Sequence, residues 1–163
     1  MDDERAIEAA VRAAAERTGV PFEVVPCDPA LADTAAFCEQ YQVPLAVSAN
    51  CVVVAGRRAE TSTMAACLVL ATDRADINKA VRRHLDLRKI SFASMADAVA
   101  QTGMEYGGIT PIGLPQDWPI LVDDQVARSD WIVIGSGIRG SKIAIKGADV
   151  AALPGTDVMS ITQ

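Results

Sequence analysis

Four short apolar runs follow one another in the last third of the chain, and they constrain its fold more than any other feature. The runs are PILVDD, WIVIGSG, SKIAIKG and VMSIT, which begin at residues 119, 131, 141 and 158. Each is rich in β-branched residues, as strands are, and turns separate them more regularly than helices do. Such strands favour an antiparallel or mixed sheet over a doubly wound parallel one, so we predict an α+β fold.

Helices and strands are also predicted before these runs. Apolar residues at helical spacing predict helices over residues 4–18, 34–41, 75–86 and 94–103, and Asp33, Asp76 and Ser94 are placed to cap the last three. Residues 21–25 and 88–94 predict short strands. The runs CVVVA and MAACLVLA predict a hairpin with Arg57 and Arg58 near its tip, and residues 148–153 predict a short last helix.

Length and composition indicate one domain over residues 1–163. Half of the residues are apolar but only 4% are aromatic, so the core must consist mainly of Ala, Val, Ile and Leu. The acidic start MDDERAIEAA lacks the features of a secretory signal, and no apolar run approaches the ~18–20 residues of a membrane helix. We therefore expect a cytoplasmic protein that does not bind a membrane.

The cysteines and the single histidine do not predict a metal site or a Cys–His nucleophile. The cysteines are too widely spaced for a CxxC pair, and we expect buried, reduced thiols at Cys27, Cys38, Cys51 and Cys67. His84 is expected on a helix surface. No metal and no cofactor is predicted.

The charge is unevenly distributed. Residues 1–50 hold nine acids and three bases, which is the whole net charge of −6, whereas residues 51–163 are neutral overall. Within that neutral part, the segment from Arg74 to Lys89 carries six basic residues against two acids. It is either a site for phosphates or an ordinary solvated helix face, and only clustering in space would favour the first interpretation.

Two glycine-rich motifs could bind ligands. GSGIRG, residues 135–140, matches the dinucleotide motif GxGxxG, but the following SKIAIKG alternates like a strand, so a hairpin turn is predicted instead. GGITPIGLP, residues 107–115, combines three glycines with two prolines. The prolines restrict the backbone and the glycines permit close approach, so this loop is either a rigid row of amides for a carbonyl oxygen or a stiff connection.

The order of these motifs resembles a known family. TGMEYGGITPIG, then a strand, GIRG, another strand and ADVAAL are similar to the YbaK and prolyl-tRNA-synthetase-associated editing domains. ADINKAVRRHLDLRKISFAS and AVSANCVVVA extend the resemblance over nearly the whole chain. It implies a largely antiparallel, barrel-like central sheet, and hydrolysis of the ester that joins a wrong amino acid to the terminal adenosine of a tRNA.

The resemblance also implies the residues of the site. Main-chain amides of the loop would hold the aminoacyl group, and the ribose hydroxyl of the substrate would help to activate water. Carried over by position, the loop residues are Gly107, Gly108, Thr110, Pro111 and Gly113, and the other substrate contacts are Asn50, Gly137, Arg139 and Asp149. The resemblance implies the acceptor end of a mischarged tRNA as the binding partner. It is also compatible with an aminoacyl-tRNA synthetase as a second partner.

One departure from the family pattern leaves alternatives open. Many members have a lysine, thought to hold the phosphate of the terminal adenosine, where this chain has Asn50. Asparagine brings no charge, so another residue such as Arg57, Arg58 or Lys142 could contact the phosphate. Alternatively, the chain is a module that binds an acceptor end or a protein without hydrolysis, or it cleaves another small ester or amide. Ser136 marks a smaller departure, because the serine of some members is expected one place earlier.

Overall fold

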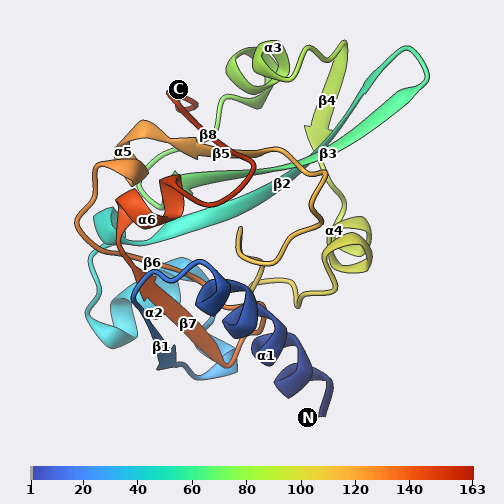
Figure 1. Ribbon diagram of the computed structural model, residues 1–163. Coiled ribbons are helices and arrows are strands. Elements are labelled where there is room, and N and C mark those ends of the chain that lie inside the picture. Colours follow the sequence, from blue (N-terminus) through green and yellow to red (C-terminus); the bar gives the residue numbers. More distant parts are fainter. Residues whose placement is uncertain (1) are drawn as a thin grey trace.

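The strands form two sheets in the computed structural model, which describes residues 2–163 (Figure 1). The smaller sheet has the order β1-β7-β6, and both of its pairings are antiparallel. Its strands are β1 (Phe22–Pro26), β6 (Ile132–Gly135) and β7 (Ser141–Ile145). The turn between β6 and β7 contains the glycines of GSGIRG, which confirms the predicted hairpin.

The larger sheet has the order β4-β2-β3-β5-β8. Its strands are β2 (Ala49–Arg58), β3 (Thr61–Leu70), β4 (Lys89–Phe92), β5 (Ile120–Asp123) and β8 (Thr156–Met159). β4, β2 and β3 pair antiparallel, whereas β3, β5 and β8 pair parallel. The fold is therefore mixed and largely antiparallel α+β, as predicted, but its strands form two sheets and do not close into one barrel.

Helices occupy the predicted segments, and one further short helix, over Asp124–Ala127, was not predicted. The helices are α1 (Asp2–Arg17), α2 (Thr34–Tyr41), α3 (Arg82–His84), α4 (Met95–Thr102), α5 (Asp124–Ala127) and α6 (Gly147–Ala151), with shorter turns η1 (Pro29–Leu31), η2 (Leu45–Val47) and η3 (Ile77–Val81). The side chains of Asp33, Asp76 and Ser94 cap their helices as expected. The predicted helix over residues 75–86 is wider at its start, since η3 is a π-helix.

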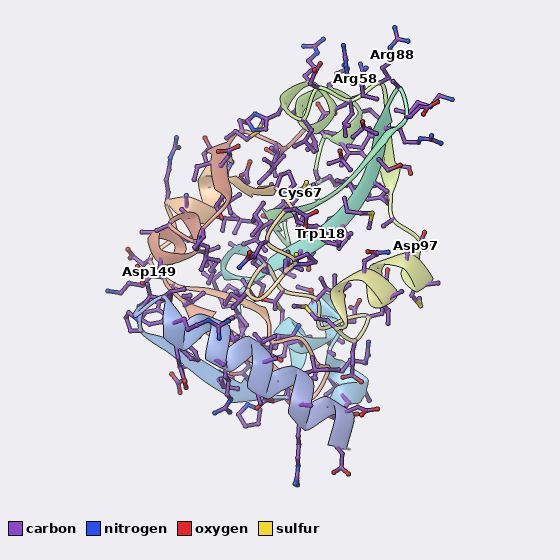
Figure 2. All side chains as sticks on the ribbon, turned by 45° about the vertical axis from the view of Figure 1, so that its right-hand side comes forward. Arg58, Cys67, Arg88, Asp97, Trp118 and Asp149 are labelled. Carbon is purple, nitrogen blue, oxygen red and sulfur yellow. The ribbon has the colours of Figure 1, made fainter. Side chains whose placement is uncertain are left out.

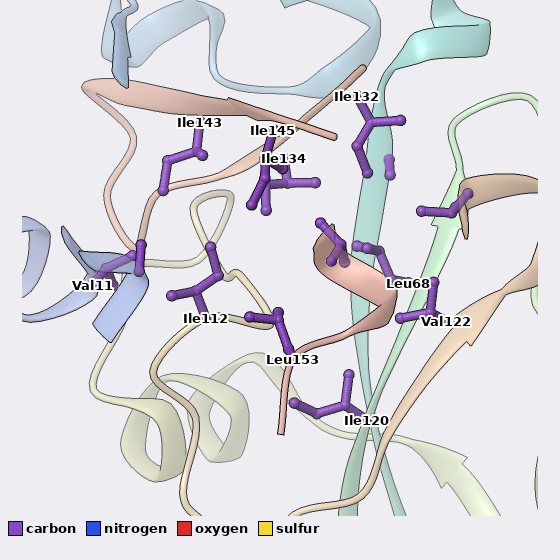
Figure 3. Close-up of a cluster of buried hydrophobic side chains, with 14 of the residues drawn as sticks. Val11, Leu68, Ile112, Ile120, Val122, Ile132, Ile134, Ile143, Ile145 and Leu153 are labelled. Carbon is purple, nitrogen blue, oxygen red and sulfur yellow. The ribbon is translucent and has the colours of Figure 1, made fainter. Parts of the chain in front are cut away.

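The main core lies between the two sheets and is closed by α1 and α6 (Figure 3). It contains Val11 of α1, Leu68 and Val122 of the larger sheet, and Ile134 and Ile143 of the smaller one. On the opposite face of the larger sheet, neighbouring β3 residues Cys67 and Val69 pack against η3. Both faces of β3 are thus covered, which explains its uninterrupted apolar run.

The last strand lies earlier than predicted. β8 covers Thr156–Met159 rather than residues 158–162, because it pairs in parallel with β5 from Ile120↔Thr156 to Asp123↔Met159. The chain then turns inward, and the N–H group of the fully buried Ile161 donates to the carboxylate of Asp123 at 3.0 Å. Ile161 is therefore a core residue beyond the strand.

The expectations about His84 and about three of the cysteines are confirmed, whereas Cys51 is only half-buried. All four cysteines are free, and three of them are buried. His84 is exposed and lies 2.9 Å from the carboxylate of Asp157. No helix within residues 2–163 is both long and apolar enough to cross a membrane.

Candidate functional site

A cavity of about 580 Å³ opens beside the start of β2, where α2, β7 and the Gly107 loop converge. We call it the central cavity. Its polar and backbone-rich walls include Asp33, Thr34, Asn50, Gly107, Ile109 and Lys142. Asn50 and the first part of the glycine–proline loop, which are far apart in the sequence, thus border one space.

Asn50 is held in place by α2. The hydroxyl of Thr34, the first residue of α2, donates to the Asn50 side-chain oxygen at 2.5 Å. This bond leaves the amide nitrogen of Asn50, a donor, without a protein partner within residues 2–163. Asn50 can therefore donate a hydrogen bond to a ligand in the central cavity.

Lys142 reaches the same cavity from β7. It is only 7% exposed, and its ammonium donates to the main-chain oxygen of Ala32 at 2.9 Å. The ammonium also lies 5.0 Å from the centre of the Phe37 ring. Burial lowers the pKa of Lys142, and no carboxylate within the described range is close enough to form an ion pair with it.

Gly107 and Gly108 are required for the shape of the loop. Gly107 has a φ of +92°, which residues with a side chain rarely adopt. A Cβ on Gly108 would lie 2.5 Å from the main-chain oxygen of Ile138. The loop is therefore pressed against the turn between β6 and β7, and Gly137 donates to the Gly108 oxygen at 2.7 Å.

The amides of the loop differ in availability. The N–H group of Gly108 is already bonded to the oxygen of Glu105 at 2.9 Å. By contrast, Gly107 and Ile109 line the cavity, and their N–H groups have no protein partner among residues 2–163. Gly107 and Ile109 are thus the two residues of the loop that line this cavity and keep an N–H group without a partner among residues 2–163.

The second half of the loop faces away from Asn50. Pro111 and Gly113 line a different cavity, of about 520 Å³, together with Ala14 and Arg17 of α1. Thr110 is fully buried, and its hydroxyl has no hydrogen-bond partner. Of the five loop residues carried over from the family, only Gly107 lines the central cavity.

Arg139 lies outside the cavity and connects two segments of the site by hydrogen bonds. Its guanidinium donates to the main-chain oxygens of Pro29, at 3.1 Å, and Tyr106, at 3.2 Å, while its own N–H group donates to the Glu105 carboxylate at 2.8 Å. These bonds join the loop before α2 to the residue preceding Gly107. Arg139 is not among the lining residues, so its contacts indicate a positioning role.

The remaining sequence candidates lie apart from the central cavity. Gly137 has its Cα close to α1, since a Cβ there would lie 2.9 Å from Val11 and 3.0 Å from Ile7. Ser136 is buried and bonds to the Ser141 hydroxyl at 2.7 Å. Asp149 lies on α6, at the side of the molecule labelled in Figure 2, and does not line the cavity.

Two exposed aromatic residues mark the rim of the central cavity. Phe92, at the end of β4, is 59% exposed, and Tyr106, just before the glycine loop, is 52% exposed. Both line the cavity. Exposed rings beside a cavity offer flat surfaces on which a base or another ring can stack. Neither residue was a sequence candidate, because a lone aromatic residue has no recognisable spacing.

A group of arginines lies at the opposite end of β2. Arg58, Arg82, Arg83 and Arg88, which we call the arginine cluster, line one shallow depression with Asp86. Figure 2 shows Arg58 and Arg88 at the same end of the molecule. Arg58 is paired with Asp86 at 3.0 Å, which leaves an excess of positive charge. Three of the six basic residues in the segment that the sequence left ambiguous thus cluster in space.

The thiol that lines the central cavity is not activated as a nucleophile. Cys51 lines it, but burial, together with the neighbouring Cys67, raises the pKa of the Cys51 thiol. A thiol with a raised pKa stays protonated and is a poor nucleophile. Within residues 2–163, no three or more His, Cys, Asp or Glu side chains are grouped so that they could hold a metal ion.

Comparison with known proteins yields one family and several similar folds. Residues 28–153 match the model of a family described as aminoacyl-tRNA editing domain. The chain is also similar to the crystal structure of a protein proposed as a trans-editing enzyme for prolyl tRNA synthetase, with 18% identity, 96% of each chain covered and a TM-score of 0.81. The hypothetical protein APE2540 is 16% identical over 94% of this chain and 99% of its own, with a TM-score of 0.84. At these identities the structures establish the shared fold.

Proposed function

This chain belongs to the aminoacyl-tRNA editing domain family, and we propose on that basis that it is a trans-acting aminoacyl-tRNA deacylase. It would hydrolyse the ester between a wrong amino acid and the terminal ribose of a tRNA. The observation that carries the proposal is that Asn50, Gly107 and Ile109 border one cavity. In this role the protein acts on a tRNA acceptor end released by a synthetase.

The available amides define how the ester would be held. The N–H groups of Gly107 and Ile109 would bind the ester carbonyl oxygen and then the oxyanion that develops when water attacks it. No general base or thiolate of the cavity is needed, because the neighbouring ribose hydroxyl of the substrate helps to activate water. Gly108 supports these amides through its contact with Ile138, and Arg139 fixes Tyr106 beside them.

The rim and the arginine cluster would bind the rest of the tRNA. The terminal adenine would stack on Phe92 or Tyr106, since both rings are exposed at the cavity. The phosphates of the acceptor stem would contact the arginine cluster, at the other end of β2. This second contact is electrostatic and independent of sequence, so it would weaken as salt concentration rises.

A panel of mischarged tRNAs tests the enzymatic proposal. We expect at least one to lose its amino acid faster than by spontaneous hydrolysis, and Asn50→Ala to slow that reaction, because it removes a donor from the cavity wall. Gln101→Ala, on the exposed face of α4, is the matched control. If no member of the panel is hydrolysed faster than in buffer, the deacylase proposal is wrong.

A second candidate function rests on Asn50. Because the family lysine is missing there, the chain would bind a charged acceptor end or a protein partner without turnover. Binding assays with charged and uncharged tRNA separate the two functions. A stable complex with charged tRNA that keeps its amino acid would favour the non-catalytic module.

A further inference from the structure

Lys142 stands out as a buried cation that forms no ion pair with any residue the structure describes. It is 7% exposed, and its known contacts are one main-chain oxygen and the face of the Phe37 ring. An ammonium has three donors, and the Ala32 oxygen accepts from only one of them. Buried charges in proteins are usually paired, because removing them from water is unfavourable. A lysine that keeps two donors unused in such a place indicates a ligand.

The position of Lys142 identifies the space in which that ligand lies. Among the described residues that line the central cavity, Lys142 is the one cation, and it shares the wall with the uncharged Asn50. The arginines near the tip of the β2–β3 hairpin do not line this cavity. Any anionic group that enters the cavity therefore has a single cationic partner among the residues that line it.

We propose that the Lys142 ammonium binds the phosphate of the 3′-terminal nucleotide when the acceptor end occupies the central cavity. The inference rests on the proposed function, because it takes the acceptor end of a tRNA as the ligand. That end carries one phosphate next to the terminal ribose, and an ammonium forms short charge-assisted hydrogen bonds with phosphate oxygens. Lys142 thus supplies from β7 the positive charge that Asn50 lacks on β2.

The charged surroundings agree with an anionic ligand. Asp33, at the start of α2, faces Lys142, but its carboxylate accepts from the N–H groups of Ala35 and Ala36. Arg139 lies on the other side and repels the ammonium. The thiols of Cys27 and Cys38 are the other titratable groups near Lys142. Burial raises the pKa of Cys27, so its thiol stays neutral. No neighbour therefore removes the charge of Lys142 before the ligand binds.

Adenosine 5′-monophosphate and adenosine are the probes, because they differ only in the phosphate. Isothermal titration measures both with the full-length protein, the variant Lys142→Met and the control Lys146→Met. Lys146 is exposed and lies four residues further along the chain. Wild type and Lys146→Met are expected to prefer the monophosphate roughly tenfold, and Lys142→Met to lose this preference while still binding adenosine.

Two further measurements keep the test independent of folding and of turnover. Lys142→Met should unfold at a temperature no lower than wild type, since it replaces a buried charge with an apolar chain of similar length. Adding Asn50→Lys to Lys142→Met should restore part of the preference for the monophosphate. Neither probe contains an aminoacyl ester, so binding is measured without turnover. If wild type prefers the monophosphate but hydrolyses no aminoacyl-tRNA, the deacylase proposal is wrong and the phosphate contact of Lys142 is retained.

The inference is overturned if Lys142→Met is folded and prefers the monophosphate as strongly as wild type does. It is also overturned if wild type binds the two probes equally. In that case an effect of Lys142→Met on kcat alone would assign the ammonium to the developing oxyanion of the ester.

Discussion

Positive charge is buried at one end of strand β2 and exposed at the other. At the first end, Lys142 is a single buried cation beside Asn50, whereas at the other end the arginine cluster is exposed around Arg58. The eight residue steps from Asn50 to Arg58 span roughly 26 Å of extended strand. A buried charge is hardly screened and acts at one atom, but exposed charges are screened by salt and attract a polyanion from any direction. In the proposed function, the cavity end would therefore determine the chemistry and the exposed end would contribute affinity for tRNA.

Gly108→Ala should produce the largest effect, and it should be confined to the cavity end. Its Cβ would lie 2.5 Å from backbone atoms of Ile138, so the loop must move away from the turn. We expect the free energy of unfolding to fall by about 1–3 kcal/mol and kcat by roughly a hundredfold, because the amides are displaced. Urea unfolding and single-turnover deacylation measure the two effects.

Gly103→Ala is the control for Gly108→Ala. Gly103 also has a positive φ, of 70°, but no atom lies within 4 Å of its Cβ position. The left-handed backbone alone should lower stability by about 1–2 kcal/mol, with kcat unchanged. Equal losses of kcat in the two variants would contradict the role of the Gly108 contact.

Phe92→Ala should have the next largest effect on catalysis. Loss of a stacking surface for the terminal adenine weakens binding by about 1–3 kcal/mol, which raises KM for aminoacyl-tRNA. The change should be nearly the same at low and high salt, because stacking is not ionic. Met95→Ala is the control, since Met95 is 58% exposed against 59% for Phe92 but lies outside the cavity. If both variants had a similar KM, Phe92 would not be part of the surface that binds the terminal adenine.

The double variant Arg82→Glu/Arg88→Glu tests the exposed end. We expect the affinity for tRNA to fall about tenfold at low salt, and the slope of log affinity against log salt to decrease by about 2, because two phosphate contacts are lost. Hydrolysis of a short aminoacyl-adenosine substrate should not change. Arg5→Glu/Arg17→Glu, on α1, alters the net charge equally and is the control. An equal loss in both double variants would mean that only net charge matters.

Raising the pH should affect stability and ligand binding in opposite directions. Burial lowers the pKa of Lys142 below its ordinary value of 10.5, so between the lowered value and 10.5 the unfolded chain binds more protons than the folded one. Stability therefore rises with pH in that window, as the unfavourable buried charge disappears, while the preference for adenosine 5′-monophosphate declines.

The difference in the free energy of unfolding between wild type and Lys142→Met, measured at each pH, isolates this effect. The subtraction removes the contributions of groups such as Cys67, whose pKa burial raises to about 12, because they titrate in both proteins. Chemical denaturation at several pH values supplies the stability curve. If this difference in unfolding free energy did not change with pH up to 10.5, Lys142 would not be a buried, charged residue.

Cys51→Ala should have the smallest effect on catalysis. The thiol lines the cavity but stays protonated because burial raises its pKa. We expect kcat to change less than twofold, and thiol alkylation of wild type to be slow. A large loss of kcat would show that Cys51 takes part in the reaction.

The sequence predicted the local elements well because local chemistry determines them. The caps at Asp33 and Ser94 and the hairpin between β2 and β3 depend on residues close together in the chain. The parallel pairing of β3, β5 and β8 does not, since it joins segments tens of residues apart, and the last strand was therefore placed too late. The single barrel-like sheet implied by the family resemblance was wrong, because no local pattern shows whether the strands join into one sheet or two.

The site was less predictable than the fold for the same reason. Alternation in SKIAIKG places Ile143 and Ile145 on the core face and Lys142 on the other, which a sequence would assign to solvent. The structure buries Lys142 because Phe37 of α2 covers that face of β7. The loop motif indicated a row of amides, but it could not show that Pro111 and Gly113 would turn toward α1.

Through Gly137, helix α1 would influence the proposed reaction without lining the central cavity. One side of this glycine meets Ile7 and Val11, and its N–H group holds the oxygen of Gly108. The helix lies outside residues 28–153, the segment that matches the family. Bulkier or smaller residues at Ile7 or Val11 would displace or relax the loop that carries the amides. In the proposed function, substrate selectivity could therefore change through a helix that does not line the central cavity.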